Sequence, residues 1–147
     1  WMDMQNTLKM FAKQLDDDAL AYFRSQLAAR KGTPFQVGQF GYSIYTKAQQ
    51  GAEVGPLAAD AVAAIEQEVE TADADLKSLL YNTMALLHDF DGKTTEAIKA
   101  QQAAIDSSDD PRVKQRLTRF LEQLQEKASK ADSDEDDSDE KEKADSQ

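Results

Sequence analysis

Residues 88–92 bring together the side chains best suited to chemistry, a histidine followed by two carboxylates and a glycine. Asp89 and Asp91 are spaced like the middle of a calcium-binding loop, D-x-D-G. Such a loop also needs an oxygen ligand two residues before Asp89 and a glutamate at its twelfth position. Those places hold Leu87 and Ile98. We therefore interpret this segment as a turn and His88 as a structural residue whose cation favours a helix C-terminus.

Other catalytic patterns find little support. The chain of 147 residues has no cysteine and one histidine, which excludes disulfides, thiol chemistry within this chain and cysteine-based zinc sites, and argues against a histidine-dependent triad. No phosphate-binding glycine loop or nucleophile elbow occurs. With 28 Asp and Glu residues, a pair of carboxylates is uninformative without geometry. We predict no enzyme activity, no cofactor and no metal; a hydrolase with an acidic site is the alternative left open.

The charge distribution also limits the partners. The formal charge is −11, and residues 132–147 carry −7 of it through nine acids and two lysines. Nucleic-acid binding needs a basic surface, and an anionic membrane repels such a chain. No apolar run approaches the roughly 20 residues of a membrane span. Beyond residue 128 there is too little apolar surface to offset chain entropy, so 129–147 is predicted to be a disordered acidic tail.

Apolar spacing of three and four residues predicts about seven helices in a domain of residues 1–128. In the first of them Met4, Leu8, Phe11 and Leu15 form one apolar face. The other apolar stripes lie within residues 20–27, 37–48, 57–69, 76–87, 97–105 and 113–124.

Local signals mark where these helices begin. Residues 16–18 are three aspartates, Pro34 and Pro111 suit the first turn of a helix, and either Asp73 or Asp75 caps the fifth helix. The third segment is predicted to be a helix, although residues 40–44 also alternate like a strand. Gly38 and Gly41 each cost a helix about 1 kcal/mol. A close neighbouring helix or an irregular helix would account for them equally well.

A repeat of 36 residues relates the fourth and sixth helices. Residues 60–62 and 68–69 correspond in residue type to residues 96–98 and 104–105, and the same offset relates Tyr45 to Tyr81. A pair of helices repeated at this period is typical of a helical solenoid.

Residues 76–111 resemble a tetratricopeptide repeat. The resemblance rests on an aromatic at the start of the first helix, small residues between the helices, a glycine at the turn and alanines along the second helix. The matching residues are Tyr81, Met84, Ala85, Gly92, Ala97 and Ala104. Pro111 lies two residues later than the family's proline, and His88 and Gln101 replace aromatics. The resemblance implies an all-α fold of antiparallel helical hairpins, stacked as a short solenoid with a closing C-terminal helix.

A second resemblance concerns context. Residues 97–105, followed by 117–124, are similar to the helical tails of larger bacterial thioredoxin-like (redoxin) proteins. A start at Trp1 rather than Met is expected for a chain that is processed or cut from a longer protein. This resemblance implies an accessory C-terminal region of a secreted or periplasmic redox protein; without it the compartment is open.

The tetratricopeptide spacing implies a groove lined by Leu79, Asn82, Leu86 and Asp89. Asn82 is the best candidate ligand residue because its amide both donates to and accepts from a peptide backbone, although it could simply be solvated. Tyr42 and Tyr45 either extend the same face or pack in the core. We therefore predict a non-catalytic module that binds a protein or peptide, with another domain of the same parent chain as one candidate partner.

Overall fold

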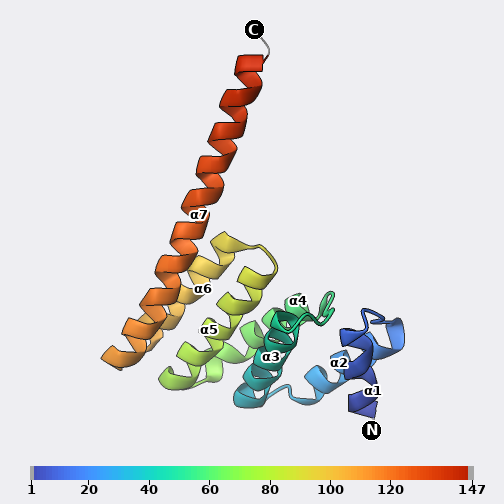
Figure 1. Cartoon of the computed structure of the whole chain (residues 1–147). Helices are drawn as coiled ribbons and strands as arrows, with labels where there is room; N and C mark the ends of the chain where they lie inside the picture. The colour runs from blue at the N-terminus through green and yellow to red at the C-terminus, as the bar shows by residue number, and fades with distance from the viewer. Residues whose placement is uncertain (1, 146–147) are drawn as a thin grey trace.

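The protein is all-α in the part of the chain that the structure, a computed structural model, describes: the backbone of residues 2–145 and the side chains of residues 2–132. Within it there are seven α-helices and no strand (Figure 1). The helices are α1 (Met2–Phe11), α2 (Asp17–Ala29), α3 (Pro34–Gln49), α4 (Leu57–Glu68), α5 (Ala74–Phe90), α6 (Thr94–Ser107) and α7 (Pro111–Asp145). A short 3-10 turn, Val69–Thr71, follows α4.

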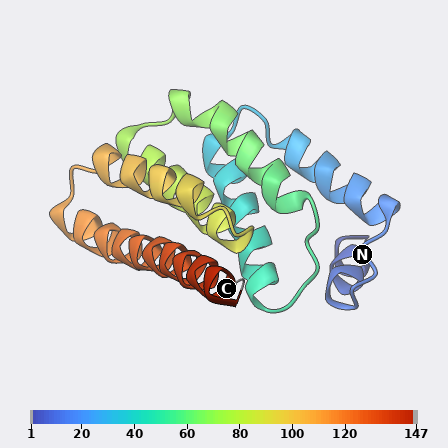
Figure 2. The same cartoon turned by 90° about the horizontal axis from the view of Figure 1, so that it is seen from above.

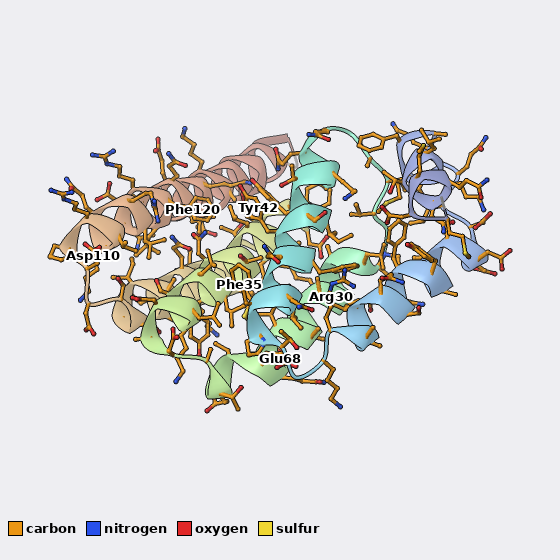
Figure 3. All side chains as sticks on the ribbon, turned by 90° about the horizontal axis from the view of Figure 1, so that it is seen from below. Arg30, Phe35, Tyr42, Glu68, Asp110 and Phe120 are labelled. Carbon is orange, nitrogen blue, oxygen red and sulfur yellow. The ribbon has the colours of Figure 1, made fainter. Side chains whose placement is uncertain are left out.

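The helices form an array in which each packs mainly on its neighbours. Helix α3 contacts both α4 and α5, the pair α5 and α6 shares an extensive interface, and α7 covers α6. At the other end α2 lies on α4, and α1 on α2. Figure 2 shows α2, α4 and α6 following one another along one side of the array, and Figure 3 gives the view from the opposite side with the side chains drawn. The predicted fold class, all-α with paired neighbouring helices, is confirmed.

The helix starts follow the local signals in the sequence. Asp16 accepts a hydrogen bond from the Ala19 amide at 2.8 Å, and Asp73 accepts one from the Leu76 amide at 2.9 Å. Each carboxylate thereby satisfies a backbone N–H that the first turn leaves without a helical partner. Of the two candidates for the cap of α5, the structure selects Asp73.

Helix α3 is regular, and its two glycines lie where other helices approach closely. A Cβ atom at Gly38 would lie 2.7 Å from the Leu80 side chain of α5. At Gly41 a Cβ would lie 3.0 Å from Ile65 of α4, with Thr83 also near. The strand alternative is therefore wrong, and of the two explanations for these glycines the structure supports close helix packing.

The 36-residue repeat reappears in the burial of α4 and α6. Ala61 and Ala97 are both fully buried, and Ile65 of α4 corresponds to Gln101 of α6, also fully buried. The Gln101 amide nitrogen donates to the Leu117 carbonyl at 2.9 Å, which links α6 to α7. Its Oε1 has no hydrogen-bond partner among the described residues. Equivalent positions of the two helices therefore face the core in the same register.

Helix α1 ends at Phe11, so it carries three of the four residues of the predicted apolar face, and these three lie on the surface. Leu15 lies beyond the helix and is half-buried against the core. Met4, Leu8 and Phe11 are exposed, and the residues of α1 that are buried are Asn6 and Met10. The Met10 carbonyl accepts from the Glu53 amide at 2.8 Å, which attaches the end of α1 to the loop between α3 and α4. The side of α1 that carries Asn6 and Met10 therefore faces the protein. The face formed by Met4, Leu8 and Phe11 stays exposed to solvent.

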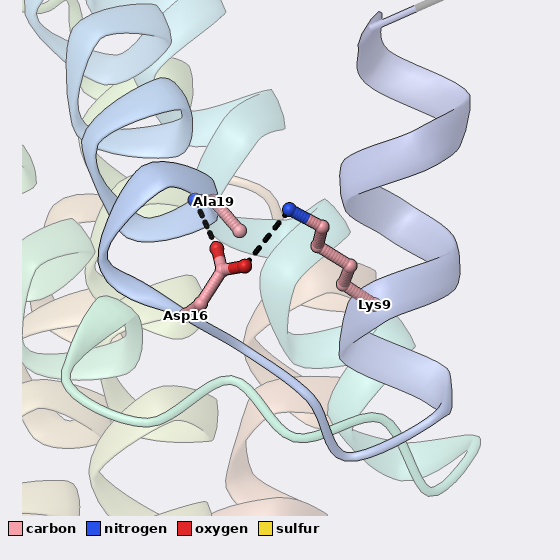
Figure 4. A network of polar contacts seen from close by, with 3 residues as sticks. All are labelled: Lys9, Asp16 and Ala19. Atoms are coloured by element: carbon pink, nitrogen blue, oxygen red, sulfur yellow. Dashed lines mark hydrogen bonds and ion pairs between the residues drawn. The ribbon is translucent and has the colours of Figure 1, made fainter.

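A polar contact also holds α1 to the start of α2. Figure 4 shows Lys9 and the Ala19 amide both directed at the Asp16 carboxylate. The Lys9 Nζ lies 2.9 Å from Asp16 Oδ2. The hydrogen bond from Lys9, and then that from the Ala19 amide, lower the pKa of Asp16 below its usual value. The pair is exposed to solvent, so its contribution to stability is small.

The acidic segment follows directly on the packed part of α7. The helix spans Pro111–Asp145, and Leu117, Leu121 and Leu124 are its buried side chains among the described residues. Residues 129–132 are all exposed. The prediction of a domain ending at residue 128 and of disorder in residues 129–147 is not tested by these observations and stays a prediction; residues 146–147 lie outside the described residues.

Candidate binding groove

A hollow of about 390 Å³ lies between α3 and α5. We call it the apolar hollow, because its lining carries no charged side chain. Three large side chains in it are about half exposed: Phe35 at 51 %, Tyr42 at 53 % and Leu79 at 48 %. The lining consists of Phe35, Gly38, Gln39, Tyr42, Ser43, Leu79 and Thr83. Apolar side chains that remain exposed around one concave site are typical of an interaction surface.

The spacing of residues on α3 produces this hollow. Phe35, Gly38 and Tyr42 are separated by three and then four residues, so they follow one another along one face of the helix. Gly38 lies between the two aromatic residues in the lining, and the space that a side chain there would occupy is filled by Leu80 of α5. Figure 3 shows Phe35 and Tyr42 on the side of α3 that faces α5. Sequence reasoning missed Phe35, although its spacing to Gly38 and Tyr42 was the available signal.

A second hollow of about 390 Å³ lies between α5 and α7. We call it the mixed hollow, because carboxylates, an arginine, an amide and apolar side chains share its lining: Asp75, Ser78, Leu79, Asn82, Ser108, Asp110, Val113, Arg116 and Leu117. Leu79 lines both hollows, so the two are contiguous across α5. We refer to the apolar and mixed hollows together as the groove.

The structure separates the four predicted site residues into two pairs. Leu79 and Asn82 line the groove, with Asn82 half-buried in the wall of the mixed hollow. Leu86 is half-buried and lines neither hollow. Asp89 is engaged in an ion pair, with the Lys127 Nζ of α7 2.9 Å from its Oδ1. All four lie along α5, but whether any of them binds a ligand stays a prediction.

Tyr42 and Tyr45 lie in different environments although their rings are 6.2 Å apart. Tyr42 lines the apolar hollow, so core packing does not apply to it. Tyr45 is half-buried against the core. Burial, and next the negative charge of Asp89, raise the pKa of the Tyr45 hydroxyl above its usual value.

His88 lies away from the groove, in a shallow hollow between α4, α5 and α6 that includes Glu66 and Glu96. Burial, and then the positive charge of Lys93, lower the pKa of His88 below its usual value. Both effects favour the neutral imidazole, and the interpretation of His88 as a structural residue stays a prediction. Among the described side chains, no group of three His, Asp or Glu residues is arranged to hold a metal ion.

Searches for membrane spans and for known relatives add no further site. In the described part of the chain, no helix combines the length and the apolar character needed to cross a bilayer. Comparison with models of protein families, with characterised proteins and with solved structures gave no match, so the resemblances to tetratricopeptide repeats and to redoxin tails stay predictions.

Proposed function

We propose that the chain is a non-catalytic interaction module that binds an extended peptide segment of another protein in the groove formed by α3, α5 and α7. In this proposal the helices form a short tetratricopeptide-like stack, in which α3 with α4 and α5 with α6 are successive hairpins and α7 closes the end. The packing of α3 on both α4 and α5, and of α7 on α6, agrees with that arrangement.

The observation that carries the proposal is the exposure of Phe35, Tyr42 and Leu79 around one hollow. Each of these side chains leaves about half of its surface in water. Covering that half with an apolar side chain of a partner would stabilise a complex by roughly 1 kcal/mol per residue. Three such contacts at one site are enough to anchor a peptide, and the remaining affinity has to come from its backbone.

The mixed hollow offers groups for that backbone. The half-buried Asn82 carries an amide that can donate to a peptide carbonyl and accept from a peptide N–H. Because Asn82 lies one turn from Leu79 on α5, a segment anchored in the apolar hollow passes within reach of this amide. Recognition in this proposal rests on shape, apolar contact and a few amide hydrogen bonds.

The test is a selection of random peptides of about ten residues, displayed on phage, against the full chain. Peptides that enrich should share an aromatic or large aliphatic residue. Their affinities are then measured by fluorescence anisotropy for the wild type and for the double variant Tyr42→Ser, Leu79→Ser. The Kd of this groove variant is expected to rise about tenfold or more.

The matched control removes exposed apolar surface elsewhere, in the double variant Met4→Ser, Leu8→Ser of α1. These residues are 59 % and 61 % exposed, so the change is chemically equivalent but distant from the groove. The control should bind the selected peptides like the wild type. A selection that enriches no sequence, or peptides that bind the groove variant as tightly as the wild type, would refute the proposal.

A further inference from the structure

A third hollow, of about 270 Å³, lies on the other side of α3 against α1 and α2. We call it the polar hollow. Its lining includes Asp3, Gln26, Arg30, Gln36, Gln39, Ser43 and Lys47. Gln39 and Ser43 line the apolar hollow as well, and Leu79 lines both the apolar and the mixed hollow. Neighbouring hollows therefore share lining residues, and we call the row of three hollows across α3 and α5 the track.

Positive charge dominates the polar hollow. Arg30 is held in place because its Nη1 donates to the Gln26 carbonyl and its guanidinium lies 5.3 Å from the centre of the Phe40 ring. Lys47 donates from Nζ to the Ser43 hydroxyl at 2.6 Å. Neither cation forms an ion pair with a carboxylate whose side chain the structure describes. Asp3 supplies the opposing charge in this hollow.

Negative charge dominates the mixed hollow at the other end of the track. It contains the carboxylates of Asp75 and Asp110 against the single guanidinium of Arg116. Asp110 also accepts from the Arg112 amide at 2.9 Å at the start of α7, which fixes its position. Figure 3 shows Arg30 on one side of α3, Phe35 and Tyr42 on the side toward α5, and Asp110 beyond them at the start of α7.

We infer that the segment bound by the groove carries an acidic side chain at the polar hollow, an apolar side chain at the apolar hollow and a basic side chain at the mixed hollow. The inference rests on the proposed function and adds the charge order of the partner. The physical basis is complementarity, because each end of the track presents the charge that such a segment would neutralise.

The spacing of these three features follows from helix packing. Helices α3 and α5 lie between the polar and mixed hollows, and each helix with its side chains is about 10 Å across, so the two hollows are separated by about 20 Å. An extended peptide advances about 3.3 Å per residue. The acidic and basic side chains should therefore be about six residues apart, with the apolar residue between them.

The test uses the peptides obtained from the phage selection, made synthetically, in double-mutant cycles with the protein. Changing the peptide's acidic residue to its amide should weaken binding to the wild type about two- to fivefold. The same peptide change should have a smaller effect on the Lys47→Gln protein, in which Arg30 is the remaining cation of the polar hollow. Changing the peptide's basic residue to Gln should likewise weaken binding to the wild type, and this change should have a smaller effect on the Asp75→Asn protein.

The matched controls are Lys31→Gln and Asp106→Asn, which remove the same charges at exposed positions outside the track. In both of them the peptide changes should weaken binding as they do in the wild type. Peptides that depend on Tyr42 and Leu79 but show no charge order, or no coupling to Lys47 and Asp75, would overturn this inference and leave the proposed function intact. Failure to select any peptide would overturn both.

Discussion

Helix α5 and helix α1 both carry large apolar side chains at helical spacing, but the two helices differ in how far these side chains are buried. Leu80 of α5 is fully buried between α3 and its neighbours, whereas Leu8 of α1 is 61 % exposed. Helix α5 has partners on several sides, namely α3, α4 and α6, while the main contact of α1 is with α2. Helix α1 keeps Met4, Leu8 and Phe11 in water because no other helix of the described part of the chain covers that face.

The largest expected difference comes from removing one leucine from each region. Leu80→Ala should lower the free energy of unfolding by about 2–5 kcal/mol, because it leaves a cavity in a packed interior. Leu8→Ala should change it by less than about 0.5 kcal/mol. Urea denaturation followed by circular dichroism measures both. Equal losses would show that α1 is buried in solution, against another molecule or segment.

Overpacking the contact between α3 and its neighbours is the next largest effect. Gly41→Leu places a side chain where a Cβ atom alone would already lie 3.0 Å from Ile65, and it should cost about 1–3 kcal/mol. The same substitution at Gly32 provides a steric control. No heavy atom lies within 4 Å of its Cβ position, so the cost of this variant, about 1–2 kcal/mol, comes from the strain of a side chain at a φ of +88° and not from overpacking. A Gly41→Leu protein as stable as the wild type would contradict the close approach.

A smaller effect is expected at the cap of α5. Asp73→Ala removes the acceptor for the Leu76 amide and should destabilise the protein by about 1 kcal/mol. Asp75→Ala, two residues further on, leaves that hydrogen bond intact and should cost a few tenths of a kcal/mol at most, from the lost charge in the first turn. Calorimetry compares the melting temperatures of the two variants. A larger decrease in melting temperature for Asp75→Ala would show that Asp75, and not Asp73, caps α5.

The pH dependence at His88 should be smaller still. Its pKa is lowered in the folded protein, so the unfolded chain binds a proton more readily there. The stability that neutral His88 contributes is present above about pH 6.5 and decreases as the pH falls below that value. Compared with His88→Gln, the wild type should lose more stability between pH 7.5 and pH 5. The variant keeps Glu66, Glu96 and Lys93, which face His88. Parallel profiles of stability against pH for the wild type and the variant would contradict a lowered pKa of His88.

The smallest effect is expected at the C-terminal end. Deleting residues 129–147 should change the free energy of unfolding by less than about 0.5 kcal/mol, because residues 129–132 are exposed and the rest is strongly acidic. A deletion from residue 117 onward serves as the contrast, since it removes Leu117, Leu121 and Leu124 from the interface with α6. A large loss for the shorter deletion would show that the tail docks on the folded domain.

The helix starts and the periodic core could be predicted because their signals are local. Pro34, Pro111 and the aspartate at position 16 act on the first turn of their own helices, and no distant contact is needed for that effect. Leu79 and Asn82 were found through a family resemblance, and both line the groove. Phe35 was missed, because the exposure of an apolar residue depends on which helix stands beside it.

The sequence by itself determined that the chain is helical, where most helices begin, and that the chain is acidic and has no cysteine. Tertiary structure decided which of two aspartates caps α5, why α3 tolerates Gly38 and Gly41, and which side of α1 faces water. The tertiary structure also decided that the three hollows of the track lie next to one another across α3 and α5. The reason is physical: periodicity specifies a face of a helix, but only the packing of helices distant in sequence determines whether that face meets a neighbour or solvent.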